Sequence, residues 1–164
     1  MSVDSAGFRE VMRRYPSGVV VVTVKAKSES RGMTAVSFSS VSLDPPLVSV
    51  AVAKNARTHQ LLKTGGGFVV NILKDNQQHL AQHFAQGLSG DDQFKSLAHH
   101  GGLVGAPILE GCLGYLECRL HSAMEAGDHT IFIGEVERAE TGEEGLPLIY
   151  FGRDYRKLGE IPPV

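Results

Sequence analysis

The chain has 164 residues, with 18 acidic and 16 basic side chains and a formal net charge of −2 at pH 7. This length suits one compact domain, which we expect to span residues 1–164 with frayed ends at 1–4 and 160–164. The balanced charge, without a run of Lys and Arg, argues against nucleic acid or an anionic membrane as the main partner. There is neither a run of roughly 18 apolar residues, as a membrane-spanning helix needs, nor a secretory signal at the N-terminus. We therefore expect a cytoplasmic protein.

The first elements follow from the spacing of apolar residues. Residues 4–14 are expected to form a short helix, because Phe8, Val11 and Met12 share one face at the i, i+3, i+4 spacing. Residues 18–24 form a dense β-branched run, which favours a buried strand. The pattern then predicts, in chain order, a polar turn over 25–31, strands over 32–38 and 47–52, a helix over 58–63, a strand over 68–73, and a helix over 77–85.

The second half contains a predicted surface excursion and a long hairpin. Residues 87–105 are polar and rich in glycine, so we expect a long loop over the surface. Residues 112–124 and 129–139 are expected to pair as strands around the turn 125–128, and residues 148–151 add a short strand. With few helices, six or so strands and 19 glycines, the fold class is mainly β, a closed or partly closed barrel.

The two cysteines lie six residues apart, at Cys112 and Cys118. On one strand, six residues span about 20 Å, and a disulfide needs Cα atoms within about 7 Å. We therefore expect two unpaired thiols that are buried as small apolar residues.

Several common catalytic motifs are absent from the sequence. It has no G-x-G-x-x-G dinucleotide fingerprint, no G-x-x-x-x-G-K phosphate loop and no G-x-S-x-G nucleophile elbow. His79 and His83 have the spacing of two ligands on one helix face, but neither an intervening Glu nor a nearby Cys supports a metal. We expect a solvated helix face there and no metal site.

Three segments can carry chemistry, although each also has an ordinary structural explanation. Residues 31–46 place small hydroxyl residues before a double proline, where exposed main-chain groups could meet the edge of a flat heteroaromatic ring; the alternative is a serine-rich strand and turn. Residues 54–58 precede a helix, where an Asn or Thr could cap it or free N–H groups could hold phosphate. Residues 127–130 put a histidine at a strand start, which by itself indicates little.

Taken together, these segments resemble the flavin reductase-like family, the split-barrel flavoproteins that include reductase components of two-component monooxygenases. The resemblance runs from Phe8 to about Tyr155. Its motifs occur in the expected order: FREVMRRYPSGVVVVT, GMTAVSFSSVSLDPPLVSVAV, FVVNIL, LAQHF, DQF, YLECRL, GDHTIFIGEV and PLIYF.

The resemblance implies a six-stranded Greek-key split barrel that forms a homodimer and binds FMN or FAD, with NADH or NADPH as hydride donor. It implies a catalytic His129, which we expect to orient the nicotinamide and not to transfer protons. The flavin-binding and dinucleotide-binding residues implied by matching position are Thr34, Ala35, Val36, Ser37, Ser39, Ser40, Lys54, Asn55, Arg57, Thr58, Phe84, Gly152 and Tyr155.

Two positions depart from the family pattern. Many relatives carry Asn where Val36 stands, so only backbone contact with the flavin is expected there. Relatives often carry Arg where Gln93 stands, which puts a phosphate contact from that loop in doubt.

The implied function is transfer of a hydride from a nicotinamide dinucleotide to flavin, with the reduced flavin passed to a separate monooxygenase. The chemistry belongs to the two cofactors, while the protein positions the rings and tunes the flavin electrostatically. Two alternatives stay open at this point. One is a flavoprotein that retains FMN and reduces a quinone, an iron chelate or a haem product, and the other is a flavin-binding sensor or store without turnover.

Overall fold

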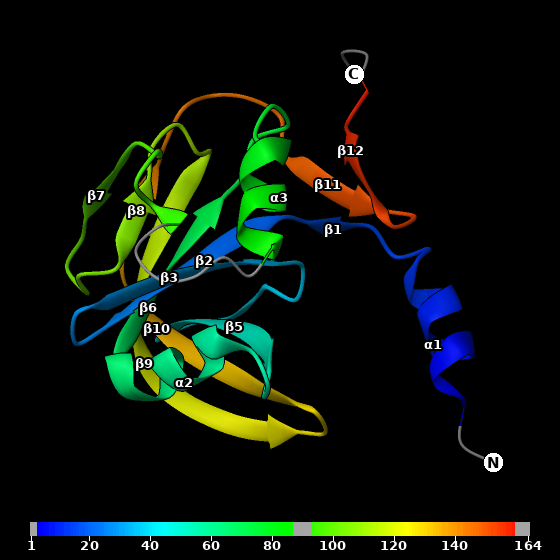
Figure 1. Ribbon diagram of the computed structural model, residues 1–164, viewed down its shortest axis with the longest axis horizontal. Coiled ribbons are helices and arrows are strands. Elements are labelled where there is room, and N and C mark those ends of the chain that lie inside the picture. The colour runs from blue at the N-terminus through cyan, green and yellow to red at the C-terminus, as the bar shows by residue number, and fades with distance from the viewer. Residues whose placement is uncertain (1–2, 87–92, 160–164) are drawn as a thin grey trace.

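The computed structural model describes residues 3–86 and 93–159. Within these ranges it has three helices and twelve strands, which confirms the prediction of a mainly β protein (Figure 1). In chain order they are α1 (Ser5–Met12), β1 (Ser17–Gly18), β2 (Val20–Ala26), β3 (Glu29–Ala35), β4 (Ser39–Leu43), β5 (Pro46–Ala53), α2 (Arg57–Gly65), β6 (Gly67–Ile72), α3 (Gln78–Ala85), β7 (His99–Gly101), β8 (Pro107–Leu109), β9 (Gly114–Ala126), β10 (His129–Thr141), β11 (Leu148–Phe151) and β12 (Asp154–Lys157). None of the helices in this part of the chain is long and apolar enough to cross a membrane.

Seven strands form the main sheet, in the order β3-β2-β6-β9-β10-β5-β4. The expected number was six; the seventh strand arises because the chain bends after β3 and returns as β4 along the outer edge of β5. Since β3 and β4 are the two ends of this order and do not pair, the barrel is only partly closed. The sequence had left a closed and a partly closed barrel open. Two smaller sheets, β1-β11-β12 and β7-β8, lie beside it.

The core has two main parts, one on each face of β2. Val20, Val22 and Val24 point into the barrel interior, where they join residues of β5, β6, β9 and β10. Val19 and Val21 belong to a second cluster, which packs under α3 and the small sheet. A strand that is buried on both faces reads as an uninterrupted β-branched run, which explains why the sequence predicted it so clearly.

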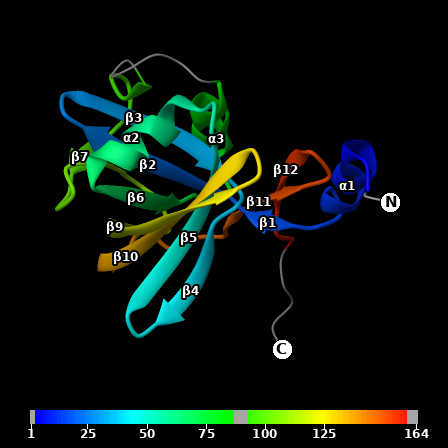
Figure 2. The same cartoon turned by 90° about the horizontal axis from the view of Figure 1, so that it is seen from below.

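Helix α1 stands apart from the barrel and is joined to it through β1 (Figures 1 and 2). Asp4 caps the helix, its carboxylate accepting a hydrogen bond of 2.7 Å from the N–H of Gly7. The predicted apolar face is present but covers nothing in this chain, because Phe8, Val11 and Met12 are 57%, 69% and 45% exposed. Frayed ends were expected at 1–4 and 160–164; residues 1–2 and 160–164 lie outside the described residues, and Asp4 is the N-cap of α1.

The prediction of a turn over 25–31 was wrong in its length. The turn contains only two residues, Lys27 and Ser28, because β2 continues to Ala26 and β3 already begins at Glu29. Lys27 has a φ of 55°, which allows the chain to reverse tightly. The consequence is that Glu29 and Arg31 are strand residues with fixed directions.

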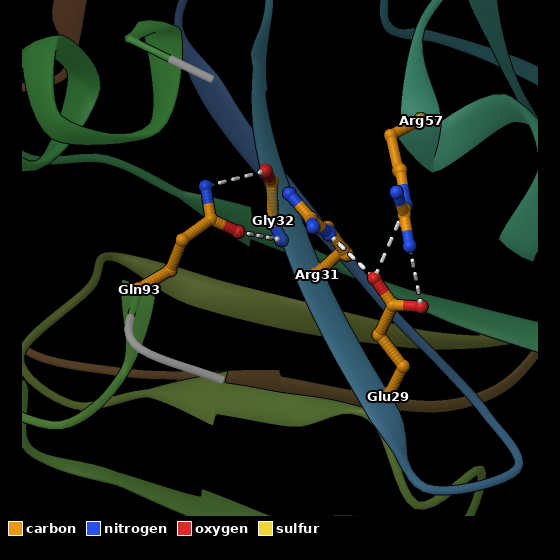
Figure 3. A network of polar contacts seen from close by, with 5 residues as sticks. All are labelled: Glu29, Arg31, Gly32, Arg57 and Gln93. Atoms are coloured by element: carbon orange, nitrogen blue, oxygen red, sulfur yellow. Dashed lines mark hydrogen bonds and ion pairs between the residues drawn. The ribbon is translucent and has the colours of Figure 1, made fainter. Parts of the chain in front are cut away.

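The segment expected to be a surface loop over 87–105 is partly buried, and its residues 87–92 lie outside the described residues. Gln93 and Phe94 are only 1% and 4% exposed. The amide of Gln93 accepts a hydrogen bond of 3.0 Å from the N–H of Gly32 and donates one of 3.4 Å to its carbonyl (Figure 3). Gln93 therefore anchors this segment to β3, and its side chain points into the protein.

The predictions for the long hairpin and for the cysteines are confirmed. Strands β9 and β10 pair along their length around a two-residue loop, in which Gly127 has a φ of 63°. Cys112 and Cys118 are both buried and unpaired.

Candidate functional site

The chain bends sharply between β3 and β4, at residues 36–38, which we call the kink. Ser37 joins the kink to β5: its Oγ donates a hydrogen bond of 2.9 Å to the carbonyl of Ala51 and accepts one of 3.2 Å from its N–H. Within the described residues, the N–H groups of the kink meet no hydrogen-bond acceptor. Val36 and Ser37 are exposed, so the kink presents free main-chain donors to solvent.

The outer face of β5 beside the kink is lined by small side chains. Val48, Val50 and Val52 point into the barrel, and the alternation of the strand leaves Ser49, Ala51 and Ala53 half-buried on the outer face. Side chains this short leave room for a planar ring against the strand. The free donors of the kink lie along the edge of this surface, because Ser37 contacts Ala51 directly.

An apolar cavity of about 560 Å³ opens between the kink and α1. Its walls include the predicted residues Val36, Ser37, Ser39 and Gly152. Further lining residues come from α1 and the turn after it, β1, the kink, β11 and the loop after β11, and they are Arg9, Met12, Arg13, Tyr15, Ser17, Phe38, Tyr150, Phe151 and Arg153. Gly152 and Arg153 have φ values of 65° and 68°, as a tight hairpin loop requires, and the N–H of Gly152 donates to the carbonyl of Arg13 at 3.0 Å.

Residues 54–58 follow directly from the end of β5. Nζ of Lys54 lies 3.1 Å from Oε2 of Glu125, and Nε of Arg57 lies 3.4 Å from Oε1 of Glu29. Asn55 is exposed, whereas Thr58 is only 5% exposed. This segment therefore offers two cationic side chains just after the end of β5.

The start of α2 has no side-chain cap. The N-cap is Ala56, which has no side-chain acceptor, so neither Asn55 nor Thr58 fills the capping role that the sequence left open. The first N–H groups of a helix lack intrahelical partners and carry partial positive charge, which favours an anion there. The start of α2 and the two cationic side chains both favour an anionic ligand.

His129 is brought to the same end of the sheet. It opens β10 and is the cross-strand neighbour of Ala53, two residues along β5 from the Ser37 contact, which is about 7 Å. Its Nδ1 lies 2.7 Å from Oδ1 of Asp128, and this interaction holds the pKa of Asp128 below its usual range. The register thus places His129 beside Ala53 at the end of β5, and residues 54–58 follow directly from that strand end.

The remaining predicted residues lie elsewhere or are turned away from the outer face of β5. Phe84 is 2% exposed and packs against Phe94 and Gly32, so the structure does not bring its ring to the surface. Tyr155 packs edge to face on Tyr150, with ring centroids 5.5 Å apart. Ala35 is buried in the barrel interior.

Thr34, Ser39 and Ser40 border the kink with different orientations. Oγ1 of Thr34 donates a hydrogen bond of 2.6 Å to the carbonyl of Ala81 in α3, so this hydroxyl is already engaged. Ser39 and Ser40 are exposed in β4.

The two helical histidines differ in environment. His79 is exposed, as expected for a solvated face, but Nε2 of His83 makes a hydrogen bond of 2.7 Å with the carbonyl of Gln93. His83 therefore helps to hold the segment after α3 in place.

Sequence reasoning missed the acidic partners and the cavity wall from α1. Glu29 and Glu125 stand in unremarkable polar stretches, and only the fold shows that they meet Arg57 and Lys54. The sequence placed Met12 on the apolar face of the N-terminal helix, and the structure makes it a cavity wall.

The structure is a partly closed barrel with small side chains on the outer face of β5, unpaired main-chain donors at the kink and two cationic side chains after β5. The flavin reductase like domain model matches residues 12–159, and the chain belongs to this family. This membership confirms the resemblance, and the protein is an oxidoreductase of the NAD(P)H-dependent flavin reductase class.

Three relatives illustrate the match. The reductase component of 4-hydroxyphenylacetate 3-monooxygenase from Thermus thermophilus is 43% identical over 151 residues, covering 92% of this chain and 95% of the relative. The solved NADH:FAD oxidoreductase of Streptomyces globisporus, in complex with NAD and FAD fragments, is 41% identical with a TM-score of 0.91, covering 98% and 96% of the two chains. The flavin reductase HpaC complexed with NADP+ is 34% identical with a TM-score of 0.89, covering 96% and 100%.

Proposed function

We propose that this protein binds FMN or FAD on the outer face of β5 and transfers a hydride to it from NADH or NADPH. The observation that carries the proposal is the kink, whose unpaired N–H groups lie beside a strand face of small side chains. When bound, the flavin accepts the hydride from the nicotinamide, and the residues of this chain supply binding, orientation and electrostatics.

The main-chain groups of the kink fit the polar edge of a flavin ring. Their N–H groups would donate hydrogen bonds to its acceptor atoms and stabilise negative charge that develops on the reduced ring. The side chain of Val36 has no polar atom, so at this position the contact comes from the backbone. Ser37 keeps the kink in place through its two bonds to Ala51 and is a positioning residue.

Residues 54–58 fit the ribityl phosphate. Lys54 and Arg57 supply positive charge, and the uncapped start of α2 supplies N–H groups that favour an anion. Thr58 is buried, so we assign it no direct contact through its side chain.

His129 would orient the nicotinamide against the flavin. It is adjacent to the outer face of β5, and Asp128 fixes its ring through Nδ1. A hydride transfer itself requires no acid or base from the protein, so a positioned ring is sufficient for this role. The 560 Å³ cavity, with its apolar and aromatic wall, offers room for the rest of the dinucleotide near Gly152.

The decisive experiment is an anaerobic titration with each nicotinamide in the presence of FMN and then FAD, followed by the flavin absorbance. Bleaching of the flavin supports the proposal and identifies the preferred pair of cofactors. Absence of reduction with all four pairs would sink it.

A homodimer is part of the proposal. Apolar side chains that cover nothing in this chain lie on α1, where Val11 is 69% exposed, and at the tip of the β4–β5 hairpin, where Leu43 is 96% exposed. Figure 2 shows both elements projecting from the barrel. Sedimentation should give the mass of a dimer, and Val11→Asp should shift it toward the monomer.

The final acceptor is proposed to be a separate monooxygenase that receives reduced flavin. The name of the Thermus thermophilus relative, a reductase component, supports this. We place the protein in the cytoplasm, where thiols stay reduced, because both cysteines are free. A chain that stays yellow after dialysis would favour the alternative of a flavoprotein that retains its FMN.

A further inference from the structure

Both cations of the proposed phosphate segment are already paired with a glutamate. Lys54 is paired with Glu125 at 3.1 Å and Arg57 with Glu29 at 3.4 Å. The two glutamates come from separate parts of the chain, since Glu29 opens β3 and Glu125 lies near the end of β9. An anion that approaches this segment therefore meets two ion pairs and not two free cations.

The partner of Arg57 is held firmly in place. Figure 3 shows the carboxylate of Glu29 between Arg31 and Arg57. Nε of Arg31, whose side chain is 9% exposed, donates a hydrogen bond of 2.8 Å to Oε1 of Glu29. The pKa of Glu29 is lowered chiefly by this bond and then by Arg57, so the carboxylate is charged at neutral pH.

Arg57 is the movable member of this group, because its side chain is 68% exposed. It can leave Glu29 and turn to another anion, while Glu29 keeps its bond to Arg31. Any phosphate that recruits Arg57 must then compete with a carboxylate that stays nearby.

In the second pair, Lys54 and Glu125, it is the backbone of the lysine that is held in place. The N–H of Lys54 donates to the carbonyl of Asp128 at 3.0 Å, so the backbone is fixed and only the side chain can change partner. The bond from Lys54 lowers the pKa of Glu125, which is also charged at neutral pH.

We infer that Glu29 and Glu125 compete with the flavin phosphate for Arg57 and Lys54, and so keep the flavin exchangeable. This inference rests on the proposed function. A phosphate that takes Arg57 and Lys54 away from their glutamates separates each ion pair and brings like charges together. A flavin without phosphate avoids both effects, so the competition acts on FMN and not on riboflavin.

The test compares FMN with riboflavin in Glu29→Gln, Glu125→Gln and the double variant, by flavin fluorescence at low salt. Exposed ion pairs have small energies, so each substitution should tighten FMN by roughly two- to fivefold and leave riboflavin unchanged. High salt should reduce the difference, because it screens exposed charges.

A matched control is Glu143→Gln, which changes the net charge by the same amount. Glu143 pairs with Lys74 just beyond the far end of β10, about 40 Å along the strand from His129. This variant should change the affinity for neither FMN nor riboflavin. In an Arg57→Gln background, Glu29→Gln should lose its effect on FMN, because the contested cation is gone.

Two results would overturn the inference. If FMN and riboflavin affinities change together, the glutamates act on the fold and not on the phosphate. If Glu29→Gln weakens FMN, Glu29 orients Arg57 for the phosphate instead of competing with it. Failure of the parental protein to bind either flavin is a different result, which would sink the proposed function itself and the inference with it.

Discussion

The hydroxyl of Ser37 replaces a missing strand residue opposite Ala51, since it both donates to and accepts from the backbone of that residue. Strand β4 pairs with β5 only as far as Ser49, and β3 ends at Ala35. One side chain therefore bridges the gap in the sheet, which leaves the neighbouring main chain free to bend and to expose its donors.

Ser37→Ala removes both bonds and should lower the free energy of unfolding by about 1–2 kcal/mol, since a net hydrogen bond contributes about 0.5–1.5 kcal/mol. Flavin affinity should fall as well, because the kink loses its attachment to β5. Urea unfolding and hydrogen exchange at the Ala51 amide would measure the two effects. Parental exchange at Ala51 would contradict the role of Ser37.

His129→Ala should slow reduction of bound flavin by about tenfold or more, which corresponds to about 1.4 kcal/mol of transition-state stabilisation. Flavin affinity should stay nearly intact, because the kink and residues 54–58 are untouched. Stopped-flow reduction and a separate flavin titration distinguish the two. His121→Ala, on the same hairpin, is the control. If the variant reduces flavin at the parental rate, His129 has no part in positioning the nicotinamide.

The strands whose burial follows a simple pattern could be predicted from sequence. The valine run of β2 and the Gly127 turn between β9 and β10 are examples. The start of β3 could not be predicted from sequence. Glu29 and Arg31 are polar and form a strand only by pairing with Ala26 and Val24 across the tight turn.

Residues of the proposed site could be named from sequence where the resemblance rests on local motifs, and not where side chains from distant segments meet in space. Ser37 and His129 were named from such motifs, and their roles stay predictions. Glu29 and Glu125 were missed, since an isolated glutamate gives no sign of the cation that it meets. The Gln at position 93 put a phosphate contact from that loop in doubt, and in the structure its amide is bound to Gly32 inside the protein.

Gly134→Ala should destabilise the barrel, because an added Cβ would lie 2.5 Å from Cζ of Phe68 and 2.7 Å from Cβ of Cys118. Overpacking of this kind costs about 1–3 kcal/mol. The expected fall in Tm is about 2–4 °C per kcal/mol for a chain of this size, measurable by calorimetry. Gly101→Ala, where an added Cβ meets open space, should leave Tm within about two degrees. Equal Tm values for the two variants would refute tight packing at Gly134.

The two cysteines should be unreactive in the folded protein. Burial raises the pKa of Cys112 to about 11 and that of Cys118 to about 12, from an ordinary value of 9.0. Since the thiolate is the reactive form, a disulfide reagent at pH 8 should label neither thiol until urea unfolds the chain. Rapid labelling of the folded protein would show that the thiols are accessible.

The same pKa values predict a loss of stability in alkali. The folded chain holds these protons more tightly than the unfolded chain, so their contribution is fully present below pH 9 and is lost as the pH rises toward 11–12. Cys118→Ala should make the decline between pH 8 and 10.5 shallower in urea unfolding. An unchanged slope would show that Cys118 does not titrate on unfolding.

Strand β2 pairs with β3 on one side and β6 on the other, and all of its side chains except Lys25 are buried. No local movement of one layer can therefore bring its amides into contact with water. Deuterium should enter these positions last, at a rate set by unfolding of the whole domain. The exchange rates of the Val21 and Val22 amides thus report global stability. Exchange rates of less protected elements can be compared with them.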